Sequence, residues 1–430
     1  MAQAERPNIL FIITDDQRYD TLEHMPVVQR ELVARGLSFT NAYVTTPLCC
    51  PSRASILTGL YAHHHGVLDN NGANGGYNAF DPSSTLATWQ DQSGMRTMLV
   101  GKYLNDYANY DIPPGWDEWF GMWDNGERYY NYIINDMGQR RVYGYREEWY
   151  SSDLLAEQAI KKLEKKRNQP FFLYLAFTSP HLPAQAAKRD VGEFDDLPLP
   201  LHPSFNEEDV SDKPSWIRAL PLMGEDNIGI MGELRRNQIA ALQSVDRAVG
   251  QVVDSLRADG RLDNTWIVFM SDNGLSLGEH RFDARKSCGY EECVRVPLVI
   301  VPPPSQAAVF GAPRTDPRLI LNIDLPPSLA ALAGTEPGRP TDGVNILPML
   351  ADPQAAWRTD GLLELWTSDD NRSFRGLRSD RWKYLRYANG EQELYDLSAD
   401  PHELDNLAGR PAQAGVVAAL SARLDVLIAQ

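Results

Sequence analysis

Apolar runs that stop abruptly at polar residues are the clearest pattern along this chain. Residues 8–14 form one such run, and it ends at Asp15 and Asp16. An uninterrupted apolar strand is typical of a parallel sheet that is covered on both faces, whereas alternation marks a strand with one wet face. The same pattern predicts further strands over residues 37–44, 95–100, 170–177, 266–270 and 297–301.

Helical periodicity lies between several of these strands. We expect helices over residues 26–35, about 151–167 and 230–258, and an irregular excursion over 183–228. Strands that alternate with helices predict an α/β fold with a large, mostly parallel (mixed) sheet between helices. After residue 350 the pattern becomes short antiparallel strands at 374–377, 382–387 and 393–396, followed by a helix near 413–428. The sequence therefore predicts a catalytic domain over 1–350 and an α+β subdomain over 351–430.

Polar clusters follow four of the predicted strands directly. They are Asp15-Asp16, Gly101-Lys102, the segment 179–181 that contains His181, and the segment 271–274. Because ligands of such folds bind beyond the carboxyl ends of the strands, we expect one shared site. Its oxygen ligands for Ca²⁺ or Mg²⁺ would be Asp15, Asp16, Asp272 and Asn273. The alternative is that these residues only cap a helix and form turns.

The stretch 49–59, Cys-Cys-Pro-Ser-Arg-Ala-Ser-Ile-Leu-Thr-Gly, predicts a short helix with a thiol at its start. Pro51 fits the first helical position and Gly59 the left-handed residue after the end. The helix N-terminus and Arg53 would together favour an anionic group beside Cys49. The alternative is a pair of small buried thiols with no chemistry.

Composition narrows the classes of function. The 430 residues are 43% hydrophobic and carry a formal charge of −17, which excludes a typical nucleic-acid binder and disfavours a long polyanion as substrate. Cys288 and Cys293 could form a local bridge or remain free thiols. No apolar run approaches the length of a membrane span, so no membrane partner is expected. Without a signal-like segment at the start we expect a cytoplasmic protein, or a periplasmic or secreted one if an export signal has been removed.

The pattern Cys-x-Pro-Ser-Arg-x-x-x-Leu-Thr-Gly resembles the signature of the type I sulfatases of the alkaline phosphatase superfamily. The resemblance implies that Cys49 is oxidised to formylglycine by a formylglycine-generating enzyme, whereas Cys50 does not fit the pattern. It also implies that Ca²⁺ is bound by the formylglycine together with Asp15, Asp16, Asp272 and Asn273.

Other segments extend this resemblance. Lys102-Tyr-Leu-Asn-Asp-Tyr is similar to the N-acetylglucosamine-6-sulfatase and extracellular endosulfatase branch, and the segment after Lys286 resembles the family's Lys-x-x-x-Tyr-Glu motif. The implied catalytic residues are Cys49, Arg53, Lys102, His181 and Lys286, with His181 as the acid that protonates the leaving oxygen. The implied candidates for substrate contact are His63, His65, Asn105 and His280, of which the first two could instead support the nucleophile loop.

One position departs from the family pattern. Leu104 stands where many sulfatases have a histidine thought to break down the sulfated intermediate, so His63, His65 or Asn105 could serve instead. The expected reaction is hydrolysis of a sulfate monoester, first of a 6-O-sulfated amino sugar and second of a small aryl sulfate. The alternatives are a phosphodiesterase or phosphonate monoester hydrolase, and a non-catalytic Ca²⁺-dependent carbohydrate-binding protein if Cys49 stays a thiol. The sequence makes no prediction about oligomeric state.

Overall fold

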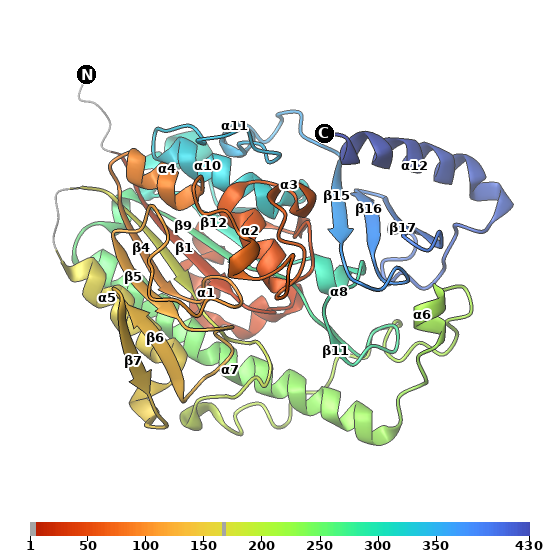
Figure 1. Cartoon of the computed structure of the whole chain (residues 1–430), viewed down its shortest axis with the longest axis horizontal. Coiled ribbons are helices and arrows are strands. Elements are labelled where there is room, and N and C mark those ends of the chain that lie inside the picture. Colours follow the sequence, from red (N-terminus) through yellow and green to blue (C-terminus); the bar gives the residue numbers. More distant parts are fainter. Residues whose placement is uncertain (1–5, 166–168) are drawn as a thin grey trace.

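A ten-stranded sheet runs through the larger part of the molecule, in the computed structural model that describes residues 6–165 and 169–430 (Figure 1). Its strands in spatial order are β13 (Arg314–Asp316), β2 (Leu37–Phe39), β12 (Leu298–Val301), β9 (Thr265–Ser271), β1 (Asn8–Thr14), β8 (Phe171–Ala176), β4 (Arg96–Gly101), β5 (Glu118–Met122), β6 (Tyr132–Asp136) and β7 (Gln139–Tyr143). The central strands β9, β1, β8, β4 and β5 are parallel, whereas β12, β6 and β7 pair antiparallel with their neighbours. The predicted mixed, mostly parallel sheet is confirmed.

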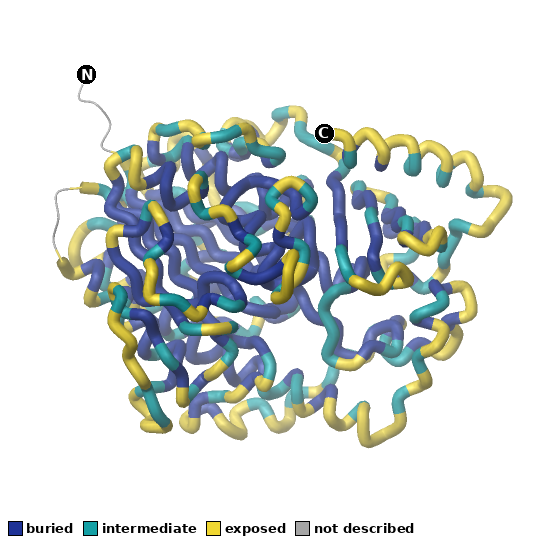
Figure 2. The backbone as a smooth tube through the Cα atoms, in the orientation of Figure 1, coloured by how far each residue is buried: buried dark blue, intermediate teal, exposed yellow. Residues whose placement is uncertain are grey.

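Helices cover both faces of this sheet, and the alternation of β1 shows how. Ile9, Phe11 and Ile13 enter one core, which contains residues of α2 (Cys49–Thr58), α4 (Leu86–Gln92) and α10 (Leu325–Leu332). Leu10 and Ile12 enter the other core, with residues of α1 (Pro26–Glu31), α5 (Ser151–Glu164) and α7 (Glu225–Ala258). The central strands are therefore buried throughout, as an apolar run without alternation predicts (Figure 2).

Some predicted boundaries differ from the structure. The expected strand over 37–44 is two short strands, because the chain turns at Asn41 and β3 (Ala42–Tyr43) pairs with β14 (Ile320–Leu321) in a separate sheet. The expected helix over 26–35 ends as α1 at Glu31 and continues as a 3₁₀ turn over Val33–Arg35. The end of the helix expected near 167 lies outside the described residues. The sequence pattern also missed β5, β6, β7 and β13.

A second, antiparallel sheet lies beside the first. It contains β15 (Asp360–Leu365), β16 (Phe374–Ser379), β17 (Trp382–Tyr387) and β18 (Gln392–Asp396), and α12 (Ala414–Ile428) packs on it through Leu424 and Leu427. Three of these strands and the helix were predicted, whereas β15 was not. The remaining short elements are α3 (Ala62–His65), α6 (Ser215–Arg218), α8 (Glu291–Val294), α9 (Ala307–Phe310), α11 (Leu347–Ala351), β10 (Ser276–Leu277) and β11 (Ala284–Arg285). The boundary between domains at residue 350 stays a prediction.

One helix in the described part of the chain is long and apolar enough to cross a membrane. It spans Pro411–Ile428, with a mean hydropathy of 1.3. The expectation that no segment reaches this threshold is therefore wrong for this helix, in which alanine, valine and leucine far outnumber the charged Arg423 and Asp425. Its two buried residues, Leu424 and Leu427, face the small sheet, and only 11% of the segment is buried.

Candidate active site

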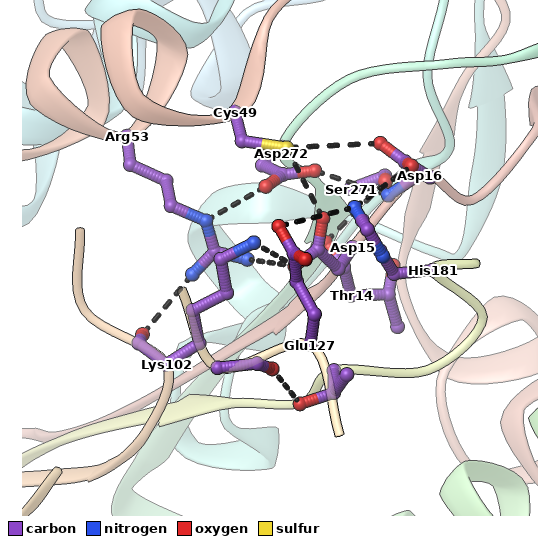
Figure 3. Close-up of polar contacts among 12 residues, drawn as sticks. Thr14, Asp15, Asp16, Cys49, Arg53, Lys102, Glu127, His181, Ser271 and Asp272 are labelled. Carbon is purple, nitrogen blue, oxygen red and sulfur yellow. Dashed lines mark hydrogen bonds and ion pairs between the residues drawn. The ribbon is translucent and has the colours of Figure 1, made fainter. Parts of the chain in front are cut away.

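Four neighbouring strands of the large sheet end at one place. β9, β1, β8 and β4 lie side by side, so the polar residues that follow them meet at a single edge (Figure 3). Asp272 follows β9, Asp15 and Asp16 follow β1, His181 comes a few residues after β8, and Lys102 follows β4. The structure thus brings together the clusters for which the sequence predicted one shared site.

Asp15 and Asp16 both face this site although they are adjacent in sequence. Successive side chains of a strand point to opposite faces, but Asp16 has a left-handed backbone conformation with φ of 61°. Its backbone N–H donates to Asp272 Oδ1 at 3.1 Å, which secures the turn. Both carboxylates are buried, and one oxygen of each lies within 4.8 Å of Cys49 Sγ and of a ring nitrogen of His181.

Helix α2 carries the candidate nucleophile, and all ten of its residues are buried. It begins at Cys49, so Pro51 is the third residue of the helix and not the first as predicted. A proline there costs no hydrogen bond, because the first four N–H groups of a helix have no partner within it. Gly59 follows the end with φ of 71°, as predicted.

Cys49 Sγ lies among both acidic and basic groups. It is 3.4 Å from Asp15 Oδ1, 3.8 Å from Asp16 Oδ1 and 2.8 Å from Lys286 Nζ. Burial, together with the charge of Asp15, raises the pKa of the Cys49 thiol well above its usual range. As encoded, the residue is therefore a neutral thiol and a weak nucleophile.

Arg53 lies one turn further along α2 and joins three strand ends. Its Nε donates to Asp272 Oδ2 at 2.7 Å, and its Nη1 donates to the carbonyl oxygen of Lys102 at 3.0 Å. Nη2 lies 3.4 Å from Asp15 Oδ2 but has no hydrogen-bond partner among the described residues. The guanidinium therefore braces the acidic cluster and keeps one donor for an anion.

Two lysines balance the carboxylates. Lys102 Nζ pairs with Asp15, and Lys286 Nζ lies 2.9 Å from Asp16 Oδ1. Although burial alone would raise it, the pKa of Asp15 falls well below its usual range because Lys102, His181 and Arg53 stabilise the carboxylate. Burial also opposes the charge of Lys286, but the attraction of the Asp16 carboxylate raises the pKa of its ammonium. The site thus holds charged groups of both signs at close range.

The donor set of this site fits a hard cation. Asp15, Asp16 and Asp272 offer carboxylate oxygens, and the buried Asn273 Oδ1 has no hydrogen-bond partner among the described residues. The amide of Asn273 is oriented by its Nδ2, which donates to Asp16 Oδ1 at 2.6 Å. Oxygen ligands of this kind favour Ca²⁺ or Mg²⁺ over Zn²⁺. The residues present therefore fit the ion that the sequence predicted.

His181 is also positioned by well-defined contacts. Its Nδ1 lies 2.6 Å from the carbonyl oxygen of Leu182, and its Nε2 lies 3.5 Å from Asp16 Oδ2. Nε2 is also 3.9 Å from Glu127 Oε1, a carboxylate that the sequence analysis did not identify. Because Nδ1 donates its hydrogen bond to this carbonyl oxygen, Nε2 is the ring nitrogen that faces the carboxylates around Cys49 and can exchange a proton there.

The remaining candidates lie elsewhere. His63 Nδ1 pairs with Glu364 Oε2 at 2.9 Å, and His65 Nε2 pairs with Ser55 Oγ on α2 at 3.1 Å. Burial lowers the pKa of His65 to about 3. His280 is fully buried and bonded to Glu207. These histidines contact other groups of residues and not the cluster around Cys49.

Leu104, which stands where many sulfatases have a histidine, is part of the hydrophobic core. Leu104 is buried in the apolar cluster that covers one face of the large sheet. Asn105 is buried next to it, and its Oδ1 has no hydrogen-bond partner among the described residues. Of the three residues left open as a base, none is placed beside Cys49 by a contact.

Three supporting residues were missed by the sequence analysis. Ser52 Oγ donates to the carbonyl oxygen of Asp272, and Asn322 Nδ2 lies 3.1 Å from Ser52 Oγ. Asn70 Oδ1 accepts the backbone N–H of Cys50 at 2.8 Å. Ser52 could have been identified because it belongs to the motif around Cys49, whereas Asn70 and Asn322 carry no local signal.

Cys288 and Cys293 form a disulfide, which decides between the two alternatives for this pair. The bridge closes the turn that follows Lys286, and both sulfurs are buried against Tyr290 and Phe282. Cys49 and Cys50 are free and buried.

Together the fold and the site define an alkaline-phosphatase-like α/β protein. A buried helix that begins at Cys49 meets a group of carboxylates at the strand ends that could hold a metal ion. Residues 7–335 match the model of the family named Sulfatase, and residues 278–430 match the C-terminal model of N-sulphoglucosamine sulphohydrolase. The chain belongs to the sulfatase family.

Two curated relatives illustrate the similarity. The extracellular sulfatase SULF-1 homolog of Drosophila melanogaster is 37% identical over 367 residues, which cover 83% of this chain but only 32% of that protein. The N-acetylglucosamine-6-sulfatase of Homo sapiens is 32% identical over 387 residues, which cover 84% of this chain and 68% of that protein. The chain thus spans about a third of the length of the Drosophila relative.

A solved structure supports the same assignment. It is a complex with its substrate D-glucosamine-2-N,6-O-disulfate, and it superposes with a TM-score of 0.82 at 26% identity. The match covers 98% of this chain and 97% of that one.

Proposed function

We propose that this protein hydrolyses a sulfate monoester of a small sugar, with formylglycine at position 49 as nucleophile and Ca²⁺ held by Asp15, Asp16, Asp272 and Asn273. The observation that carries the proposal is the setting of Cys49 Sγ, which lies at the N-terminus of a buried helix among two carboxylates and Lys286. A neutral buried thiol has no second hydroxyl with which to expel sulfate, whereas the hydrate of an aldehyde has one.

The residues of the site divide the chemistry among them. Arg53, Lys102 and Lys286 would hold the sulfate oxygens and stabilise their charge. A Ca²⁺ ion at the carboxylates of the site would supply further polarisation of the same group. One hydroxyl of the hydrated aldehyde would attack sulfur and lose its proton to water. The ester S–O bond breaks in the same step, and His181 Nε2 donates a proton to the departing alcohol. Loss of the second hydroxyl's proton to water would then break the carbon–oxygen bond to the sulfate group. This restores the aldehyde and releases sulfate, and addition of water re-forms the hydrate.

The substrate class rests on the relatives and on one cavity. A 6-O-sulfated amino sugar is the first expectation because a relative is named N-acetylglucosamine-6-sulfatase and a similar structure contains a sulfated glucosamine. A cavity of about 360 Å³ is lined by residues that include Trp123, Glu127 and Arg128. It lies beside His181, because Glu127 Oε1 is 3.9 Å from His181 Nε2. Its aromatic, acidic and basic groups fit a sugar ring with hydroxyl and amino substituents. A small aryl sulfate is the second expectation.

We also propose that the protein works outside the cytoplasm. The Cys288–Cys293 disulfide supports this location, because such bonds persist in oxidising compartments. A relative named as an extracellular sulfatase agrees with it. Of the two locations expected from the sequence, the periplasmic or secreted one is favoured.

Mass spectrometry of the peptide over residues 47–60 tests the nucleophile. After co-expression with a formylglycine-generating enzyme, we expect the aldehyde at Cys49 in the wild type and in the control variant Cys50→Ser. Cys49→Ala should show neither aldehyde nor turnover. An unmodified Cys49 in active protein would refute the mechanism, and an unmodified Cys49 in inactive protein would favour a carbohydrate-binding role.

Matched esters test the class of substrate. We expect kcat/KM on 4-nitrophenyl sulfate to exceed that on 4-nitrophenyl phosphate and on a phosphonate monoester, and N-acetylglucosamine 6-sulfate to be cleaved faster than its 3-sulfate isomer. Faster phosphonate cleavage would instead assign the phosphodiesterase or phosphonate hydrolase alternative.

A further inference from the structure

A second group of buried ionisable side chains lies where the small sheet meets the larger part of the molecule. It consists of His280, which follows β10, Glu292 in α8, and Glu403, which follows β18. One ring nitrogen and one oxygen from each carboxylate lie within 4.8 Å of one another. All three side chains are more than nine-tenths buried. None of them belongs to the cluster around Cys49.

His280 is oriented as a metal-binding histidine is. Its Nδ1 lies 2.7 Å from Glu207 Oε2, and its ring stacks on Tyr290 with centroids 3.9 Å apart. A hydrogen bond from Nδ1–H to a carboxylate leaves the lone pair of Nε2 free to bind a cation. That Nε2 is buried and has no hydrogen-bond partner among the described residues.

The carboxylates of Glu292 and Glu403 differ in how many polar partners they have. Glu403 Oε2 accepts the backbone N–H of Glu291 at 2.9 Å, and Glu403 Oε1 lies 2.7 Å from Lys383 Nζ. Lys383 is shared with Glu291, which it approaches to 2.9 Å. Glu292 Oε2 has no hydrogen-bond partner among the described residues. A buried carboxylate oxygen without a partner is costly, so a cation between these groups would stabilise the fold.

We propose that His280, Glu292 and Glu403 bind a divalent transition-metal ion, with Zn²⁺ as the first expectation, which fastens the small C-terminal sheet to the loop that carries Lys286. One imidazole and two carboxylates form a donor set for Zn²⁺ and related ions, unlike the all-oxygen protein ligands of the site at the strand ends. Glu207 accepts the hydrogen bond from Nδ1 of His280 and so fixes the orientation of the imidazole. Glu292 lies six residues after Lys286 in sequence, so the ion would anchor the same segment as the catalytic lysine.

Elemental analysis of the 430-residue chain after dialysis against Zn²⁺ tests the proposal. We expect about one equivalent of zinc per chain in addition to calcium, and less than a tenth of that zinc in His280→Gln and in Glu292→Gln, with calcium unchanged. His402→Gln is the matched control, because His402 is the neighbour of Glu403 but stacks on His202 instead, and it should retain the zinc. Wild type without zinc, or His280→Gln with as much zinc as wild type, would overturn the proposal.

A thermal measurement on the wild type covers the case in which those variants fold poorly. Protein stripped with a chelator and saturated with Ca²⁺ should gain several degrees in Tm when Zn²⁺ is added at 100-fold excess over its Kd. Asp15→Asn, which removes a ligand of the site at the strand ends, should show the same gain. A gain that is absent in both proteins, or that disappears with Asp15→Asn, would overturn the second site. Loss of activity in Asp15→Asn with the zinc response intact would concern the proposed function alone.

Discussion

Substitution of His63 tests whether this histidine stabilises the fold or contacts the substrate. Its ring Nδ1 lies 2.9 and 3.1 Å from the two oxygens of Glu364, a fully buried carboxylate of the small sheet that comes 301 residues later. The ring is therefore bonded across the junction between the small sheet and the helix that follows α2. We expect His63→Ala to weaken that junction and to leave the chemistry at Cys49 intact.

The size of the effect follows from these contacts. Hydrogen bonds to charged groups contribute about 1.5–3 kcal/mol each, and the backbone N–H of His63, at 3.2 Å from Glu364 Oε1, remains in the variant. The free energy of unfolding should therefore fall by about 2 kcal/mol. His64→Ala is the control: this exposed residue pairs with Asp342 near the surface, so the loss should stay below about 1 kcal/mol.

Urea unfolding and steady-state kinetics on a sulfate ester measure the two roles separately. We expect kcat/KM of His63→Ala to stay within about threefold of wild type, which is less than 1 kcal/mol of transition-state energy. In the background of Glu364→Gln the same substitution should cost at least about 1 kcal/mol less, because the two residues are coupled. A hundredfold fall in kcat/KM with unchanged stability and no coupling would refute this reasoning and restore His63 as a substrate contact.

Four further outcomes are expected. Arg53→Lys should lower kcat/KM by about 100-fold on a sulfate ester, because lysine cannot form the three-way fork of the guanidinium. Asn273→Leu should raise the Ca²⁺ concentration needed for half-maximal activity by about 10–100-fold, measured by titration of chelated enzyme. Replacing both Cys288 and Cys293 by alanine should lower the Tm and raise KM for the sulfate ester, because the turn after Lys286 loses its constraint. Asp20→Asn should make the free energy of unfolding fall less steeply in acid. Burial alone would raise the pKa of Asp20, but Arg18 and Arg235 outweigh burial and hold it below the ordinary value of 3.8. The stability that Asp20 contributes is therefore present above about pH 3.8 and is lost as the pH falls below it.

Each of these outcomes has a clear contradiction. Wild-type kinetics in Arg53→Lys would remove the guanidinium from the sulfate site, and unchanged Ca²⁺ dependence in Asn273→Leu would remove its amide oxygen from the metal. An unchanged KM without the disulfide would limit that bond to general stability. If the free energy of unfolding of Asp20→Asn falls with pH in parallel with that of the wild type, the ion pairs of Asp20 do not determine the loss of stability in acid.

Local patterns were sufficient for much of this protein. The apolar run of β1 and the two acids after it predicted a buried strand with an acidic pair at its end, because burial on two faces and the end of a strand are properties of neighbouring residues. The helix with Cys49 at its start and Gly59 after its end was predicted for the same reason. The small sheet was found in part: β16, β17 and β18 were predicted, whereas β15 was missed although turn-forming residues follow it at 368–371.

What the sequence by itself determined is the set of chemical groups and the strand or helix end that each one occupies. Only the tertiary structure decided which groups meet. Arg53 reaches Asp272 across 219 residues, and His63 reaches Glu364 across 301. His63 and His65 were interpreted as support for the nucleophile loop or as substrate contacts, and His280 as a substrate contact. In the structure His65 bonds Ser55 on α2, whereas His280 faces a second buried cluster. Such pairings depend on how the loops leave the ten-stranded sheet, and a contact between distant residues leaves no periodic trace in either segment.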